Sequence, residues 1–430
     1  MASHLSKTDF NTQLVDFLNS SPTPFHAVKS MSSALESAGF EYLNETECWQ
    51  LEAGKGYFTT RNGSSIIAWR QPIESYGFER GLRLTGAHTD SPCLKVKPNP
   101  ETLKQGYFQL GVEVYGGVLL NPWFDRDLSI AGRVTVKLAS GGIASYLTDF
   151  EKPIAMIPSL AIHLDREANA ARTINAQTYL PPILGLANEK PDFKSLLKQQ
   201  LLSIEPSVEA VLDYELSFYD YQKASLLGLK DEFIVSARLD NLISCFIGLK
   251  ALIASSPGAG QVLICNDHEE VGSASACGAQ GPMLSQWLTR ILPDDVNAYA
   301  VFANSFFISA DNAHGIHPNF ADRHDDNHGP KLNAGPVIKI NANQRYASNS
   351  ETSAQFRDLA EKAGVPVQAF VVRSDQGCGS TIGPIIATET GIPTVDVGVP
   401  QFAMHSIREM AGSEDAFNLA KVLEQHYQVS

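Results

Sequence analysis

Hydrophobic and polar positions follow two different patterns along this chain. Between residues 98 and 231, apolar side chains recur at every second position, for example at Leu110, Val112 and Val114. A period of two is typical of half-buried antiparallel strands. Residues 196–202 add a short amphipathic stretch that fits a helix. We expect residues 98–231 to form one inserted, β-rich domain.

From residue 232 onward, short continuous apolar runs alternate with longer helical stretches such as Asn241–Ala254 and Ala354–Ala363. Such runs are typical of buried strands in α/β proteins. We expect residues 1–97 and 232–430 to form a discontinuous α/β domain with a largely buried, mixed or parallel sheet. Its predicted strands after residue 231 are Phe233–Val235, Val262–Cys265, Ala298–Ile308, Val365–Val372 and Thr394–Val397.

The N-terminal part predicts one helix followed by strands. Asp9–Leu18 has helical spacing, with Thr8 as its N-cap, and the prolines at 22 and 24 end it. Apolar clusters at 66–68 and 82–84 predict two strands. The second strand runs toward His88, which we expect just beyond the strand end.

Composition and charge restrict the class of protein. The 430 residues suffice for two domains, and a content of 43% hydrophobic and 19% charged residues is typical of globular proteins. No apolar run of about twenty residues could span a bilayer. Met1–Phe17 lacks the basic start and apolar block of an export signal, which predicts a cytoplasmic location. A net charge of -14 would repel a phosphate backbone, so we expect neither a nucleic-acid partner nor a membrane.

The cysteines show no recognisable metal-binding or disulfide spacing. They are scattered without a CxxC pair, which disfavours both a disulfide framework and a thiolate zinc site. We expect all of them to be reduced core residues, namely Cys48, Cys93, Cys245, Cys265, Cys277 and Cys378.

Polar side chains follow the predicted strands at the position where ligand sites gather in open α/β sheets. They are of two chemical types, imidazole and carboxylate. Such donors suit zinc, manganese or cobalt at hydrolytic sites. The set predicts a two-metal centre and consists of His88, Asp240, Glu269, Glu270, Asp311 and His405.

Each of these residues, taken alone, has an ordinary structural interpretation. Asp240 and Asp311 are both followed by asparagine and fit helix caps. His88 fits a turn, and His405 fits a packed core histidine. The adjacent glutamates fit a solvated surface, although two carboxylates after a buried strand repel each other unless a cation or a proton intervenes. Their joint occurrence at five predicted strand ends favours the metal centre.

Longer phrases along the chain are more specific than single residues. They are, in order, SPTPFHAV, GAHTDSPCLKVKP, NPWFDRDLSIAGRV, AIHLDR, SARLDNL, CNDHEEVGS, SADNAHGIHPN, GPVIKINANQRYA, DQGCGSTIGP and VDVGVPQFAMHSIRE. In these phrases the chain resembles the M18 metallopeptidases, the family of aspartyl and vacuolar aminopeptidases, over essentially its whole length. The resemblance implies a zinc-peptidase domain with helices on both faces of a mixed sheet, and an inserted domain that mediates dimerisation.

The resemblance also implies chemical roles. Glu269 is similar to the family's general base, and Asp90 is expected to orient His88. The implied cofactor is a pair of divalent ions per subunit, zinc first, with manganese or cobalt as alternatives. The implied ligands, with Asp240 bridging the two ions, are His88, Asp240, Glu270, Asp311 and His405.

Peptides are the implied substrates. The resemblance implies substrate contacts by His314, Lys339 and Tyr346. We expect carboxylates such as Asp311 to recognise the free α-amino group. His163 is similar to a family histidine that enters a neighbouring subunit's site and donates a hydrogen bond there, although a metal-associated role is an alternative. Without the resemblance, Lys339 fits a solvated strand position and His163 an interior polar group.

The resemblance further implies a homo-oligomer, a dodecamer built from dimers, and a preference for acidic N-terminal residues. The basic residues near the motifs are few, namely Lys339, Arg345 and Arg373. Two alternatives remain open: a metal-dependent deacylase of N-acyl amino acids, and a catalytically inactive assembly or scaffold protein.

Overall fold

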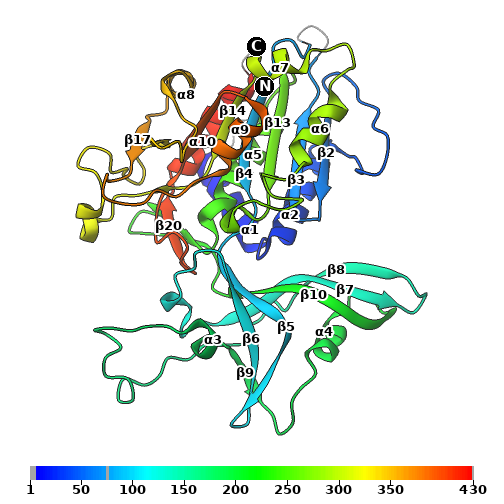
Figure 1. Cartoon of the computed structure of the whole chain (residues 1–430), viewed down its shortest axis with the longest axis vertical. Helices are drawn as coiled ribbons and strands as arrows, with labels where there is room; N and C mark the ends of the chain where they lie inside the picture. The colour runs from blue at the N-terminus through cyan, green and yellow to red at the C-terminus, as the bar shows by residue number, and fades with distance from the viewer. Residues whose placement is uncertain (1–5, 74–76, 429–430) are drawn as a thin grey trace. The chain divides into compact units, whose positions relative to one another are not determined.

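The computed structural model describes residues 6–73 and 77–428, so the first five residues of the segment considered for an export signal lie outside it. The chain forms two compact units. The first unit comprises Met1–Asp90, Ala224–Met404 and Glu409–Ser430, and the second comprises Ser91–Lys223 and His405–Arg408 (Figure 1).

The boundaries differ from those expected at 97/98 and 231/232. Strand β5 (Cys93–Lys104) is continuous and pairs with two strands of the second unit, so the chain enters that unit before residue 93. Strand β11 (Ser225–Leu227) pairs with a strand of the first unit and returns the chain earlier than expected. His405–Arg408, expected within the first unit, belongs to the second.

The first unit is built on a nine-stranded mixed sheet, which confirms the predicted α/β class. Four neighbouring central strands, β13, β4, β14 and β18, are parallel, and antiparallel pairings flank them. In sheet order the strands are β1 (Glu41–Tyr42), β2 (Gly56–Arg61), β3 (Ser65–Arg70), β13 (Gly260–Asn266), β4 (Leu82–His88), β14 (Phe306–Ala310), β18 (Thr394–Gly398), β16 (Val337–Ile340) and β17 (Gln368–Val371).

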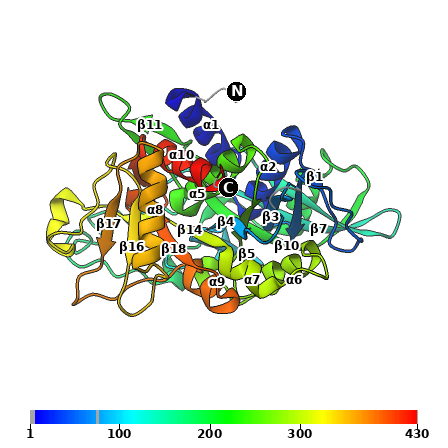
Figure 2. The ribbon, with the colours of Figure 1, turned by 90° about the horizontal axis from the view of Figure 1, so that it is seen from above.

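Helices pack on both faces of this sheet because its central strands are apolar on both sides. In β13, Leu263 and Cys265 join one core cluster, whereas Val262 and Ile264 join another. Figure 2 shows α1 and α10 on one side and α6, α7 and α9 on the other. The first cluster includes α1 (Lys7–Asn19), α2 (Pro24–Ser37), α5 (Leu239–Ala254), α8 (Ser350–Lys362) and α10 (Asp415–Gln428), and the second includes α6 (Met283–Ile291), α7 (Ala298–Asn304) and α9 (Ile382–Thr390).

Several local predictions were wrong in their details. The N-cap of α1 is Ser6, whose hydroxyl accepts from the Asp9 N–H, whereas Thr8 lies inside the helix. Pro24 does not end α1, which stops at Asn19, but opens α2 at its first turn. The predicted strand Ala298–Ile308 is a helix followed by a strand, because the Asn297 side chain caps α7.

A separate five-stranded sheet also belongs to the first unit. Its order is β11, β12 (Phe233–Ser236), β20 (Glu409–Gly412), β19 (Pro400–Phe402) and β15 (Ala313–His314). The run Phe233–Val235 was expected in the main sheet and lies here instead, because β12 pairs with β11 and β20.

The second unit holds a six-stranded antiparallel sheet, as the period-two pattern predicts. Its strands, in sheet order, are β8 (Ile143–Asp149), β7 (Leu128–Leu138), β10 (Val208–Asp220), β5, β6 (Tyr107–Tyr115) and β9 (Ile183–Leu186). Helix α4 (Phe193–Leu201) confirms the amphipathic stretch, with Phe193, Leu197 and Leu201 buried, and α3 spans Ala176–Tyr179. Among the described residues, no helix is both long and apolar enough to cross a membrane.

The cysteines are free thiols, but not all of them are core residues. Cys245, Cys265 and Cys277 are buried, and Cys93 and Cys378 are half-buried. Cys48 is exposed, so the core prediction is wrong for it.

Candidate metal centre

Three neighbouring parallel strands of the main sheet bring candidate ligands to one edge. His88 is the last residue of β4, Asp311 directly follows β14, and Glu269 and Glu270 open a short 3-10 turn after β13. Since β4 lies between β13 and β14, the carboxyl ends of all three strands meet there. Sequence spacing predicts this convergence, with the small correction that His88 lies within its strand.

Carboxylate oxygens surround one nitrogen of the His88 imidazole. Its Nδ1 lies 3.1 Å from the carbonyl oxygen of Asp90, which holds a proton on Nδ1 and turns Nε2 toward the carboxylates. Nε2 lies 3.3 Å from Asp240 Oδ1, 3.5 Å from Asp311 Oδ1 and 3.9 Å from Glu269 Oε2. The side chain of His88 is 2% exposed, so this nitrogen faces the carboxylates in a buried place.

Asp240 reaches this place from a different sheet. It follows β12 of the five-stranded sheet and lies at the irregular start of α5, where Asp240 and Asn241 have non-helical backbone angles. Its backbone N–H donates to Glu409 Oε2 at 3.1 Å. Ligand atoms of His88, Asp240 and Glu270 all lie within 4.8 Å of one another. The side chain of Asp240 therefore faces His88 rather than capping a helix.

The electrostatics of this cluster fit a divalent cation. Burial raises the pKa of Glu269 to about 7, with His88 opposing the shift and nearby aspartates adding to it. Burial and the neighbouring Asp240 carboxylate raise the pKa of Glu270 well above its usual range. Burial disfavours a charged His88, yet Glu269, Asp240 and Asp311 hold its pKa well above its usual range. One imidazole among converging buried carboxylates is a donor set that zinc accepts.

Lys339 is buried beside the cluster rather than solvated. It is 2% exposed, and its Nζ donates to Asp311 Oδ2 at 3.2 Å and to the Asn312 carbonyl at 3.1 Å. Nζ also lies 5.1 Å from the ring centre of the buried Tyr346. The structure thus brings Asp311, Lys339 and Tyr346 together.

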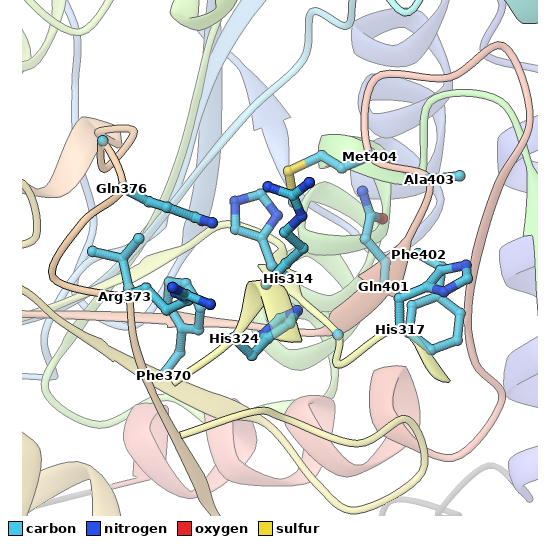
Figure 3. Close-up of a pocket in the computed structure, with 14 residues that line it drawn as sticks. His314, His317, His324, Phe370, Arg373, Gln376, Gln401, Phe402, Ala403 and Met404 are labelled. Atoms are coloured by element: carbon cyan, nitrogen blue, oxygen red, sulfur yellow. The ribbon is translucent and has the colours of Figure 1, made fainter. Parts of the chain in front are cut away.

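A pocket of about 300 Å³ begins next to these residues, at His314 on β15. Figure 3 shows His314 among side chains of three chain segments, which include His324, Arg373 and Met404. The described residues that line the pocket carry two arginines and three histidines and no carboxylate. They include His314, His317, Arg323, His324, Arg373 and Gln376.

Two predicted site histidines lie in the second unit. His405 has its Nδ1 3.1 Å from the Gly117 carbonyl oxygen, which fixes the ring and directs the lone pair to Nε2. Its backbone has a positive φ of 68°. His163 is exposed and lies in a loop between β8 and α3.

One residue that supports this region was not among the candidates from the sequence. Asp396 in β18 is fully buried and accepts hydrogen bonds from Thr381 Oγ1 and from the Ala347 N–H, each at 2.6 Å. These contacts hold the segment that carries Tyr346. The sequence feature that could have identified Asp396 is that it is a lone charged residue within an apolar strand. The pocket residues Arg323 and His324 carried no signal beyond their place after Asp311.

Comparisons with known proteins give a consistent result. The family model for "Aminopeptidase I zinc metalloprotease (M18)" matches residues 17–427. A relative from Ectopseudomonas mendocina (strain ymp), "Probable M18 family aminopeptidase 2", is 60% identical over 420 residues, 96% of this chain and 97% of the relative.

Solved structures are similar over almost the whole chain. The "Cryo-EM structure of the Ape4 and Nbr1 complex" matches with a TM-score of 0.94 at 39% identity, over 98% of this chain and 86% of the other. The "Structure of S. cerevesiae mApe1 dodecamer" matches with a TM-score of 0.83 at 29% identity, over 97% and 96%.

Proposed function

Since this chain belongs to the M18 family of zinc metallo-aminopeptidases, we propose that it removes acidic N-terminal residues from peptides with a pair of divalent ions and Glu269 as general base. Aminopeptidase activity follows from membership of the family. This membership favours an aminopeptidase over the deacylase and scaffold alternatives. The observation that carries the proposed mechanism is the group of carboxylate oxygens around His88 Nε2, at 3.3 to 3.9 Å.

Binding of two divalent ions requires several anionic ligand atoms that converge at one buried place. When bound, the ions supply Lewis-acid polarisation of the scissile carbonyl and of a water molecule. The His88, Asp240 and Glu270 side chains offer converging donors within 4.8 Å. His88, Asp240, Glu270, Asp311 and His405 would hold the ions in this proposal. His163 is a ligand only in the alternative assignment.

Glu269 is suited to move the proton. Burial gives it a pKa of about 7, near the value at which a carboxylate can both take a proton and return it. Its backbone N–H and that of Glu270 both donate to the Asp90 carboxylate at 3.1 Å, which fixes the turn that carries both glutamates. Glu269 thus takes the proton from the attacking water and passes it to the leaving amine.

Substrate recognition divides between an anionic and a cationic part. The Asp311 carboxylate, held by Lys339, accepts hydrogen bonds from the free α-amino group. His314, Lys339 and Tyr346 contact the rest of the terminal residue. Two arginines in the lining of the pocket at His314, Arg323 and Arg373, support an acidic side chain there, although Arg373 also pairs with Asp375 at 2.7 Å.

A neighbouring subunit completes the site in this proposal. One similar protein was solved as a dodecamer. Exposed apolar side chains, Leu160, Ile162 and Leu164, flank His163, as expected of a loop that another subunit covers. We assign a homo-oligomer, a dodecamer built from dimers through the second unit, in which His163 donates a hydrogen bond in the neighbour's site.

The decisive experiment compares Glu269→Gln with wild type in zinc content and in turnover of aminoacyl substrates. The variant should keep its metal and lose about three orders of magnitude or more in kcat. Glu361→Gln, an exposed change on α8, is the matched control. Wild-type turnover by Glu269→Gln, or full activity of protein stripped of metal, would overturn the mechanism.

A further inference from the structure

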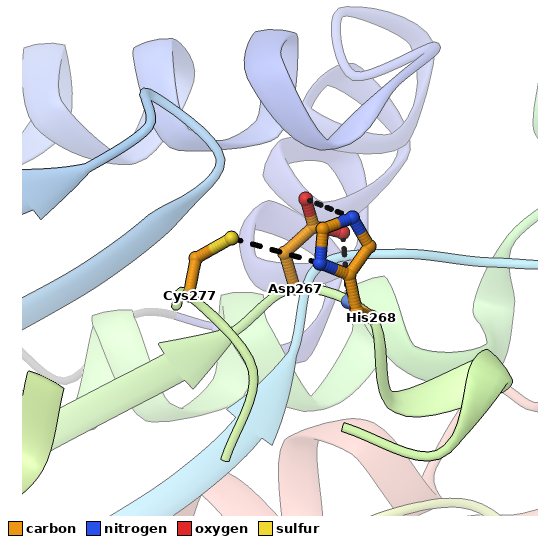
Figure 4. A group of neighbouring side chains, drawn as sticks. All are labelled: Asp267, His268 and Cys277. Atoms are coloured by element: carbon orange, nitrogen blue, oxygen red, sulfur yellow. Dashed lines mark hydrogen bonds and ion pairs between the residues drawn. The ribbon is translucent and has the colours of Figure 1, made fainter. Parts of the chain in front are cut away.

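A second group of metal-binding side chains lies in the first unit, apart from His88. It consists of Asp267, His268 and Cys277, and one ligand atom from each lies within 4.8 Å of the others. Figure 4 shows dashed lines from the imidazole of His268 to the carboxylate of Asp267 and to the thiol of Cys277. Its Nε2 lies 3.5 Å from Asp267 Oδ2, and its Nδ1 lies 3.6 Å from Cys277 Sγ.

The backbone fixes the two sides of this group. Ser65 Oγ and Asn266 Nδ2 donate to the Cys277 carbonyl, at 2.8 and 3.2 Å. The hydroxyl of Ser65 in turn accepts from the Asp267 N–H at 2.9 Å. The backbones of Cys277 and Asp267 are therefore held next to each other through Ser65 of β3 and Asn266 at the end of β13.

The chemistry of the three donors suits zinc. Carboxylate, imidazole and thiolate are all zinc ligands, and a thiolate selects zinc over magnesium, calcium or manganese. As zinc ligands, the Asp267 carboxylate and the Cys277 thiolate would together supply two negative charges, which one divalent ion balances. Hydrogen bonding to His268 holds the pKa of the Cys277 thiol below its usual value, as ligation requires.

Two of the three side chains are buried, and the third is partly exposed to solvent. Asp267 and Cys277 are 4% exposed, whereas the His268 side chain is 27% exposed. An ion would reach these donors past the imidazole, and three protein ligands would leave one position for a water molecule.

We propose that Asp267, His268 and Cys277 bind an additional zinc ion, separate from the pair at His88. The carbonyl of His268 accepts from the Ser273 N–H at 2.8 Å, so His268 anchors the turn that carries Glu269 and Glu270. An ion bound by His268 restricts the motion of the turn that carries the two glutamates. The site contains a thiolate, whereas the ligands proposed for the pair at His88 are imidazoles and carboxylates.

That difference supplies a test that does not depend on activity. Full-length protein stripped of metal is titrated with cobalt(II) alone, and the near-ultraviolet sulfur-to-cobalt charge-transfer band is recorded. Wild type should show the band together with one more bound ion than Cys277→Ser. The band should be lost in Cys277→Ser and retained in the matched control Cys48→Ser, because Cys48 is exposed elsewhere.

Failure of the inference is separable from failure of the proposed function. Absence of the band in fully loaded wild type overturns the site without any variant, so a misfolded variant cannot obscure the result. Survival of the band in Cys277→Ser also overturns it, since another cysteine is then the ligand. Loss of the band in Asp267→Asn, with the cysteine intact, would support the assigned carboxylate.

Discussion

The carboxylate of Asp90 accepts a hydrogen bond from the backbone N–H of Glu269 at 3.1 Å. Its second oxygen accepts from Glu270 N–H at the same distance, and Oδ1 lies 3.3 Å from His88 Nδ1. One buried carboxylate thus connects the end of strand β4 to the turn after β13. Through these contacts, Asp90 sets the positions of a proposed ligand and of the proposed base together.

This relationship predicts the effect of Asp90→Asn. An amide keeps one acceptor oxygen but turns an NH₂ group toward the other backbone N–H, so the turn must shift. We expect a loss of about 10- to 100-fold in kcat/KM or in zinc affinity. Steady-state kinetics and zinc competition with a chelator measure both quantities. Asp295→Asn, an exposed change, should leave both unchanged; unaltered values in Asp90→Asn would contradict a positioning role.

Lys339→Met should destabilise the metal-free protein more than the zinc-loaded protein. Without zinc, the loss of Lys339 removes one of the two cationic neighbours of the Asp311 carboxylate and leaves only His88, which costs up to about 3–5 kcal/mol. Bound zinc beside Asp311 would replace part of that charge. Urea unfolding with and without zinc measures the difference. An equal loss in both states would argue against Asp311 as a ligand.

Because His426 is buried, we expect the free energy of unfolding to fall at acid pH. Burial, with Arg83 adding, lowers its pKa to about 3, while its Nε2 donates to the Leu84 carbonyl at 3.1 Å. In the unfolded chain the pKa is about 6.5, so the unfolded state binds more protons between these values. The contribution of neutral, buried His426 to the free energy of unfolding is fully present above pH 6.5. It falls by up to about 1.4 kcal/mol per pH unit below that value.

Replacing this histidine should remove that part of the pH dependence. We expect the free energy of unfolding of His426→Gln to be lower than that of wild type at pH 7, with the gap narrowing toward pH 5. His328→Gln, at a half-exposed histidine, is the control. A gap that stays constant between the two pH values would contradict the low pKa of His426.

The basic pocket predicts substrate preference. Wild type should cleave Asp p-nitroanilide faster than Leu p-nitroanilide, by about tenfold if one ion pair worth about 1.4 kcal/mol distinguishes them. Arg373→Gln should lower the Asp rate and spare the Leu rate, because Arg373 lines the pocket. Arg357→Gln on the exposed face of α8 is the control. Equal rates on both substrates in wild type would overturn the acidic preference.

The loop of His163 predicts a link between assembly and activity. Leu164 is 75% exposed, and Leu164→Asp should weaken a contact that buries it, so that smaller species form with little activity. Mass photometry and turnover on the same sample test this. Ile143→Asp, at a comparably exposed position of the same unit, is the control. Fully active monomers would refute the role of His163 in a neighbour's site.

Local pattern correctly predicted the elements in which burial follows the sequence period. The alternation at Leu110–Val114 became an antiparallel strand, and the apolar run Val262–Cys265 became a central one. The prediction of one strand over Ala298–Ile308 was wrong, because apolar content alone does not distinguish a short helix from a strand. There, the Asn297 cap and the break at Ser305 decided the outcome.

By itself, the sequence determined the class of fold, the family and the chemical types that follow the strands, because these depend on local period and on short phrases. Only the tertiary structure decided that Asp240 comes from a second sheet, that Lys339 is buried against Asp311, and that His405 groups with the second unit. These facts depend on which distant segments pair. The period of one segment reports how much of it is buried, but not which other segment buries it.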